Sequence, residues 1–172
     1  QTQYEDRGER NIYGGLGWRL TDRLLVRANV GKDEFLGFNQ DTASVRSILW
    51  NPKEQIHGDA SLYYTLKNDG KLGYSFRHFD EQVSNLGEIR RPQFRPYSFD
   101  DYYQTIRSDH QLNYDGALGG RHYLQVVAGF NRYQRYKNTF RLNFPDEFQD
   151  ESQEEVDGLQ DTSRFDALMM RA

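Results

Sequence analysis

The sequence predicts an all-β fold, an antiparallel transmembrane β-barrel segment, from three observations. First, segments of strand length alternate apolar and polar residues, so each predicted strand has one apolar and one polar face. Second, short turns alternate with long polar loops along the chain, as on the two rims of a bacterial outer-membrane barrel. Third, large aromatic residues recur on the apolar face near the short turns, where an interfacial girdle would lie.

The composition excludes several other classes of protein. Mean hydropathy is −0.94 and 28% of the residues are charged, which a barrel tolerates because only alternate strand residues meet lipid. No stretch approaches the roughly 18 apolar residues of a membrane-spanning helix. The net charge is −4 with Lys and Arg scattered, so no nucleic-acid partner is predicted. The absence of cysteine excludes disulfides and thiolate metal sites.

The first predicted hairpin joins residues 11–20 to residues 24–31 through residues 21–23, whose types suit a tight turn. Its even-numbered positions are apolar or small: Ile12, Gly14, Leu16, Trp18, Leu20, Leu24, Val26, Ala28 and Val30. A long polar stretch, residues 32–53, follows. Residues 44–50 within it could be extended, but a separate membrane strand there would break the alternation of short and long connections. We therefore assign them to the loop.

The second predicted hairpin joins residues 55–67 to residues 71–80 through an Asn-Asp-Gly turn, in which Asp-Gly is a strong hairpin signal. Folding the chain about Asp69 sets Arg77 opposite Ser61 and diagonal to Asp59. That arrangement predicts a charge pair on the polar face.

The rest of the chain is read as two more strands, the start of a third, and two loops. It is predicted to be irregular from residue 81 to about residue 101, because it holds two prolines and three arginines there. Residues 104–114 and 123–136 alternate again, around a short turn at residues 116–120. An acidic loop, residues 137–162, precedes a strand that starts at Phe165. The total is about six to seven strands, each near the roughly 9 to 11 residues that cross a bilayer obliquely.

The face assignment gives two sets of residues. The predicted lipid-facing residues are Ile12, Leu16, Trp18, Leu24, Val26, Leu62, Tyr64, Tyr74, Phe76, Leu124 and Val126. The predicted inward residues are Arg27, Asn29, Asp59, Ser61, Arg77, Arg107, Asp109 and Asn113. On the lipid-facing side, Trp18, Tyr64, Tyr74 and Tyr114 lie near short turns and form the predicted aromatic girdle.

Two other architectures share part of this pattern. A soluble β-sandwich, such as a carbohydrate-binding module, also alternates along its strands, but it predicts a second layer of strands over the apolar face. A passive porin-type barrel shares the whole pattern and differs in lacking a plug.

Successive stretches of the chain resemble the barrel of TonB-dependent outer-membrane receptors. The stretches are 50–55, 61–64 with 73–77, 99–103, 137–140 and 160–165. The resemblance implies a 22-stranded barrel with an N-terminal plug in the bacterial outer membrane. Such a receptor imports a scarce ligand, such as a siderophore, cobalamin or a glycan, and releases it when TonB pulls on the plug. Residues 1–172 then correspond to part of the barrel wall, with no plug or signal peptide and cut at both ends. Its partners would be outer-membrane lipid, TonB through the plug, and the ligand at the loops.

Ligand contact is predicted at a long loop rich in arginine. Its candidate residues are Arg90, Arg91, Phe94, Arg95 and Tyr97. Guanidinium groups pair bidentately with carboxylate or phosphate oxygens, so this cluster could clamp an anionic ligand. The competing interpretation is a solvated loop that also touches lipopolysaccharide phosphates.

No catalytic, cofactor or metal site is predicted. Ser108, Asp109 and His110 have the residue types of a hydrolase, but adjacent strand residues face opposite ways, so Asp109 cannot orient His110. Ser108 and His110 share the predicted lipid face, where they lack an orienting partner. The acidic run 146–161 lacks the spacing of a calcium loop. The four histidines lie on separate segments.

Overall fold

The structure is a computed structural model that describes residues 2–5, 8–38, 46, 50–92, 95–118, 122–144 and 152–171. Every regular element in these ranges is a β-strand. The strands are β1 (Thr2–Glu5), β2 (Glu9–Thr21), β3 (Leu24–Phe35), β4 (Lys53–Thr65), β5 (Lys71–Leu86), β6 (Tyr97–Leu118), β7 (His122–Asn143), β8 (Ser152–Glu155) and β9 (Asp161–Arg171). None of the described residues belongs to a helix long and apolar enough to cross a membrane.

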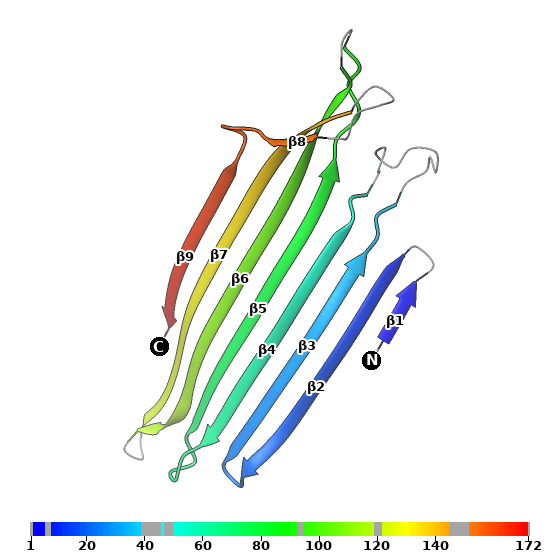
Figure 1. Cartoon of the computed structure of the whole chain (residues 1–172). Helices are drawn as coiled ribbons and strands as arrows, with labels where there is room; N and C mark the ends of the chain where they lie inside the picture. The colour runs from blue at the N-terminus through cyan, green and yellow to red at the C-terminus, as the bar shows by residue number, and fades with distance from the viewer. Residues whose placement is uncertain are drawn as a thin grey trace.

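The nine strands form one antiparallel sheet in which each strand pairs with the next, except that β9 pairs with β7. β8 continues the sheet along the upper part of β7, and β9 along the lower part. Strands β2 to β7 lie side by side (Figure 1), with the three predicted short turns at one end and the three predicted long loops at the other. This arrangement of connections agrees with the sequence analysis.

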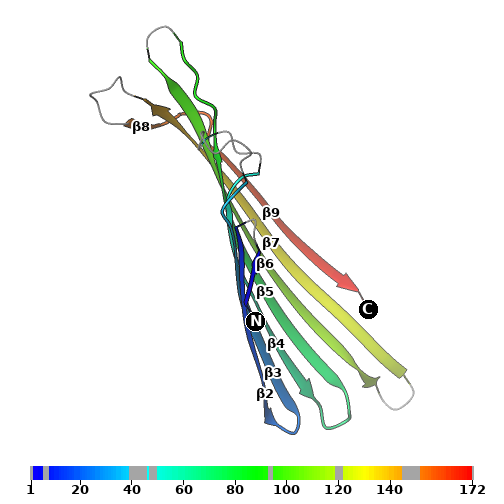
Figure 2. The same ribbon diagram turned by 90° about the vertical axis from the view of Figure 1, so that its right-hand side faces the viewer.

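The sheet is a single twisted layer. Seen from the side, no second sheet covers either face of strands β2 to β7 (Figure 2). Among the described residues no hydrophobic side chain is buried, and large apolar side chains stay open, including Leu16 at 65% and Trp18 at 68% exposure. The described residues therefore do not form a β-sandwich, and their apolar side chains have no core within this sheet.

The pairing register sorts the side chains of β2 to β7 and β9 onto two faces. Directly paired residues share a face, so the apolar side chains of neighbouring strands line up. One transverse row contains Trp18, Val26, Leu62, Tyr74 and Leu112. We call the face that carries this row the apolar face and the opposite one the polar face. All of the predicted lipid-facing residues share the apolar face, and all of the predicted inward residues share the polar face.

The apolar residues form a belt that runs obliquely across the strands. The belt ends at Arg10 on β2 but one row lower on β3, at Lys32, which pairs with Ile12. On β7 the belt ends at Arg132, one row lower again. The row of Arg132 runs across the ladders through Ser108 to Val30 on β3. On β4 the belt reaches the row of Lys32 again, at Ile56, so the upper border falls unevenly from β2 to β7, in the direction expected of a belt of constant height across tilted strands.

The strands are longer than the sequence analysis predicts. Residues 81–86 and 97–101, predicted to be irregular, belong to β5 and β6, and β7 continues past residue 136 to Asn143. The last strand begins at Asp161 rather than at Phe165. The reason is that backbone pairing continues where both faces are polar, although the alternating pattern that reveals a strand stops there.

Two strands of four residues each were not predicted. β1 lies in the polar run at the start of the chain, and β8 lies inside the predicted loop 137–162. Both are too short and too polar to give a periodic signal. Most of the segment 44–50 lies outside the described residues, and Trp50 forms an isolated bridge with Phe38.

The register of the second hairpin differs by two residues from the prediction, because the turn is centred one residue earlier, on Asn68. Arg77 pairs with Asp59, and Ser61 pairs with Ser75. The turn holds three residues between Leu66 and Gly70, whose backbones hydrogen-bond at 2.7 Å. Asp69 takes the left-handed conformation, with φ of 61°, so Asp69 closes a three-residue loop and the Asp-Gly pair is not the centre of a two-residue turn.

Candidate functional site

The polar face carries a row of hydrogen-bonding side chains contributed by β3 to β7. Across the strands it runs Asn29, Asp59, Arg77, Asp109 and Asn131. Asn29 donates to Asp59 at 2.9 Å, and Asn131 donates to Asp109. Both aspartates are thereby engaged by amide groups of neighbouring strands.

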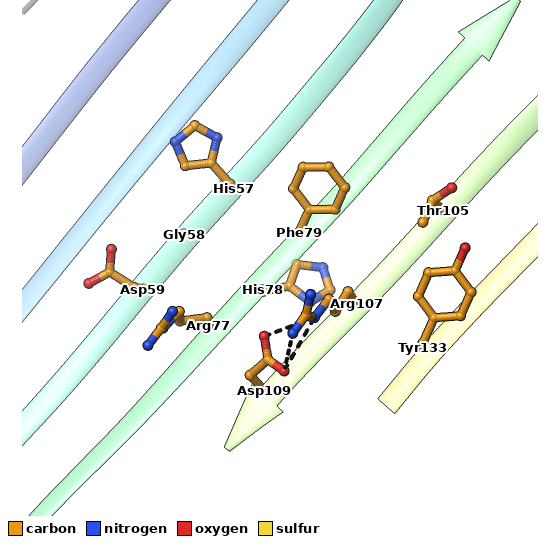
Figure 3. A pocket seen from close by; sticks show the side chains of 10 residues that line it. All are labelled: His57, Gly58, Asp59, Arg77, His78, Phe79, Thr105, Arg107, Asp109 and Tyr133. Carbon is orange, nitrogen blue, oxygen red and sulfur yellow. Dashed lines mark hydrogen bonds and ion pairs between the residues drawn. The ribbon is translucent and has the colours of Figure 1, made fainter. Parts of the chain in front are cut away.

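A hollow of about 440 Å³ lies over this row and the next one. Arg107 adds an ion pair to Asp109, with the Nε to Oδ2 distance at 3.1 Å. Arg77 lies between Asp59 and Asp109 in the same hollow (Figure 3), yet it forms no ion pair with a carboxylate of the described residues. Its guanidinium therefore keeps its donors available to a partner that lies against this face.

Aromatic side chains border the hollow on one side. Phe79 and Tyr133 lie in the adjacent row of the polar face, together with His57 (Figure 3). His57 Nδ1 lies 3.4 Å from Asp33 Oδ2, and its ring lies 5.5 Å from that of Tyr13. This combination of flat apolar surfaces and hydrogen-bonding groups suits a polar polypeptide or a small polar ligand.

The close packing of His57 and Tyr13 depends on a glycine between them. Gly31 pairs with both residues across the two ladders. A Cβ at this position would lie 2.7 Å from Tyr13 Cδ1 and closer still to the imidazole of His57. Position 31 therefore accepts only glycine without a shift of its neighbours.

The predicted arginine cluster is partly assembled. Arg90 and Tyr97 face each other in an isolated bridge, with backbone hydrogen bonds of 2.7 and 2.9 Å. The guanidinium of Arg90 lies 5.6 Å from the centre of the Phe99 ring. Arg91 and Arg95 are exposed and are not brought onto this pair. Phe94 lies outside the described residues.

Arg141 joins this cluster from β7. Its guanidinium lies 4.7 Å from the centre of the Tyr97 ring, and its Nε is buried without a hydrogen-bond partner. The predicted strand ends at residue 136, so the alternating pattern did not reveal Arg141. Continuing the odd-numbered polar positions of that strand by five residues would have found it.

The rim cluster, defined as Arg90, Arg91, Arg95, Tyr97 and Arg141, has a strong positive charge. None of its arginines forms an ion pair with a carboxylate among the described residues, although Glu154 of β8 lies opposite Arg141 in the ladder. Guanidinium groups stacked on aromatic rings and free at their edges can donate hydrogen bonds to anionic oxygens.

A buried ion pair attaches the β3–β4 connection to β6. Arg46 Nη1 and Nη2 lie 2.6 and 3.0 Å from the two carboxylate oxygens of Asp100. Ser98 also donates to Asp100 at 3.0 Å, and the side chain of Asp100 is only 2% exposed. No signal in the sequence links position 46 to position 100, because neither lies in a periodic segment of the prediction.

A second attachment joins β8 and β9 along β7. The amide of Gln160 accepts from Thr139 N at 3.0 Å and donates to Thr139 O at 3.1 Å, as a paired strand residue would. The Thr139 hydroxyl donates to Asp101 at 2.6 Å. The hydrogen bond from Lys137 to Asp101 raises the pKa of that lysine above its usual value.

The hydrolase residue types do not come together. Ser108 hydrogen-bonds His78 Nδ1 at 3.0 Å, and His110 Nδ1 hydrogen-bonds the Tyr74 hydroxyl at 2.8 Å. Ser108 and His110 share the apolar face but contact different partners. Within the described ranges, no three His, Asp or Glu side chains are grouped so as to hold a metal ion; residues 146–151 of the acidic run 146–161 lie outside those ranges.

The chain was compared with known proteins at three levels. No protein-family model, curated protein or solved structure matches it.

Proposed function

We propose that this chain forms part of the barrel wall of a TonB-dependent receptor in the bacterial outer membrane, which imports a scarce ligand. One observation carries the proposal: a single sheet whose apolar belt is continuous, oblique to the strands and uncovered. The family assignment rests in addition on the ordered series of sequence stretches described above.

The dimensions of the apolar belt support contact with lipid. It spans residues 12–20 on β2 and 56–64 on β4, close to the roughly 9 to 11 residues that an oblique strand needs. Contiguous rows of exposed apolar side chains, such as Leu168 at 81% and Met170 at 73% exposure, cost free energy when they face water. A bilayer removes that cost without a second protein layer.

The edges of the sheet bear on the same proposal. In hydrocarbon, unpaired backbone groups at an open edge cost several kcal/mol each, so spanning sheets close. In the proposed receptor, the strand begun by β1 continues along the outer edge of β2, another strand pairs with the outer edge of β9, and further strands complete the barrel. The polar face then encloses the lumen, and the row from Asn29 to Asn131 lies against the plug.

The rim cluster is the proposed ligand contact. It lies beyond the belt at the long-loop end of β5 to β7. Its free guanidinium groups favour a ligand with carboxylate or phosphate oxygens. Replacing Arg90, Arg91, Arg95 and Arg141 with serine in the full-length receptor is expected to weaken ligand affinity at least about tenfold. The control is Arg10→Ser at the same rim, and equal affinity of both variants would remove the clamp.

The proposed function is tested on the full-length polypeptide in bacteria. It should remain in the outer-membrane fraction after carbonate extraction and should migrate differently on a gel with and without heating. Ligand uptake should stop when TonB is deleted. A stable monomer in the absence of detergent would instead identify a soluble module, and uptake independent of TonB would identify a passive porin.

A further inference from the structure

We infer that Arg132 and Arg164 bind the phosphate of a membrane lipid headgroup on the apolar face, at the upper border of the belt. This inference rests on the proposed function, because it requires the belt below to contact acyl chains. It adds a lipid-binding site to a surface for which the proposed function needs only apolar contact.

The position of the two arginines fits a headgroup. Arg132 follows Phe130 on β7, and Phe130 pairs with Leu168 of β9 in the last apolar row. Arg132 pairs with Asp166, and Arg164 lies one row higher, paired with Gln134. Both guanidinium groups therefore lie directly beyond the belt, at the height where headgroup phosphates meet the protein if the belt is in hydrocarbon.

The charge of this patch differs from that of the rest of the border. Arg132 Nε and Arg164 Nη2 share one carboxylate, Asp166, at 3.1 and 3.3 Å. The patch therefore has an excess of one positive charge. Elsewhere on the border each cation has its own carboxylate: Lys32 lies 2.6 Å from Glu54, and Arg10 lies 3.8 Å from Glu34.

The two guanidinium groups keep free donors. Their side chains are 48% and 54% exposed, whereas Asp166 occupies one edge of each. Each guanidinium has five N–H donors, so most remain open to a phosphate. Arg132 also lies 5.7 Å from the centre of the Phe130 ring, which holds it against the belt.

Two further polar side chains extend the patch along the same row. The Ser108 hydroxyl and His78 pair next to Arg132. The other carboxylate on this part of the face, Asp80 on β5, accepts from Gln104 at 3.1 Å and lies two strands away from Arg132. Among the described residues, a phosphate bound at the two arginines would therefore have Asp166 as the one carboxylate beside it.

The site is tested with the full-length protein in detergent micelles. The probes are phosphatidic acid and a diacylglycerol with the same chains, which lacks the phosphate. Native mass spectrometry measures how much of each lipid stays bound. We expect phosphatidic acid to be retained at least about tenfold more tightly than diacylglycerol, because two charge-assisted contacts are lost with the phosphate.

Matched variants assign the binding to the two arginines. Arg132→Gln with Arg164→Gln should abolish the preference for phosphatidic acid. Lys32→Gln, at the same border but with its own carboxylate, should leave it within about twofold. Asp166→Asn should strengthen retention, because it releases the donors that the carboxylate holds.

Three results would overturn the inference while the proposed function stands. One is equal retention by the double variant in a protein that still shows heat-modifiable migration. Another is binding abolished by chelation of divalent cations, which would assign the phosphate to a metal bridge at Asp166. The third is inorganic phosphate at the same concentration displacing the lipid, which would mean that the patch recognises phosphate without its membrane anchor. Failure of membrane extraction tests, in contrast, refutes the proposed function.

Discussion

The belt and the upper extension of the same strands differ in how their sequence relates to their structure. In the belt, β2 and β3 carry apolar or small residues at every second position, and their pairing follows the predicted hairpin. In the extension of β5, β6 and β7, polar residues occupy both faces. The backbone ladder is equally regular in both regions. The two regions differ in the residue types on their faces: the belt has one apolar face, whereas the extension has polar residues on both.

This difference determines what stabilises each region. The belt has no buried apolar side chain of its own among the described residues, so its stability depends on what covers it. The extension holds the most buried polar side chains, Ser98, Asp100 and Thr139. There, specific polar contacts replace the apolar environment, and a single substitution should be felt locally.

The largest expected effect is in the extension. Asp100→Asn keeps the shape of the side chain but leaves the guanidinium of Arg46, whose side chain is 15% exposed, without its counter-charge. Breaking a buried pair in this way costs about 3 to 5 kcal/mol. Hydrogen exchange at Gly87, whose N–H also donates to Asp100 at 3.2 Å, should become faster by up to that amount, while exchange in the belt of β2 stays unchanged.

Ser98→Ala is the control for this experiment, because it removes one hydrogen bond and keeps the ion pair. Its expected cost is about 1 kcal/mol. If Asp100→Asn were no more damaging than Ser98→Ala, the ion pair would not hold the connection.

The next effect distinguishes the two faces of the belt. Leu62→Arg puts a charge on the apolar face, where it should cost about 2 to 4 kcal/mol in a bilayer. Tyr63→Arg, at the neighbouring position on the polar face, should cost less than about 1 kcal/mol. The two wild-type side chains are similarly open, at 38% and 46% exposure. Urea unfolding in lipid vesicles measures the loss of stability in each variant. If Tyr63→Arg cost more than Leu62→Arg, the polar face would be the one that contacts lipid.

How far the sequence predicts this fold depends on the region. The positions of the short turns, the faces of the strands and the row of Trp18 and Tyr74 all follow from alternation, because one face of each strand is apolar. The ends of β5, β6 and β7 do not, because alternation disappears where both faces are polar while pairing continues. The two-residue register error at Arg77 arose because sequence does not tell which turn residue adopts positive φ.

The candidate sites divide in the same way. Arg90 and Tyr97 were predicted together and are neighbours, because they lie close to each other in sequence across one loop. Arg141 was missed with the end of its strand. The Arg46–Asp100 pair joins positions 54 residues apart, and no local pattern marks it. Whether the predicted residues bind a ligand or lipid stays a prediction.

A smaller effect is expected where β8 and β9 meet on β7. Gln160→Leu removes the amide that substitutes for a strand partner and leaves Thr139 N and O without that pairing. An unsatisfied buried backbone group costs about 1 to 3 kcal/mol. The expected result is faster exchange at Thr139 and Val156. Gln160→Glu keeps the acceptor and loses the donor, so its exchange rates should lie between those of the wild type and those of Gln160→Leu.

The smallest effect is expected at the border between the two regions. Lys32 and Glu54 lie 2.6 Å apart, but their side chains are 46% and 45% exposed. An exposed pair contributes about 0.2 to 1 kcal/mol, so Lys32→Gln should change urea unfolding by no more than that. High salt should remove the difference between wild type and variant, because it screens exposed charges. A loss of more than about 2 kcal/mol, insensitive to salt, would mean that a low-dielectric layer reaches the row of Lys32. The belt would then extend one row further along β3 than its residue types indicate, and the stagger from β2 to β7 would have to be redrawn.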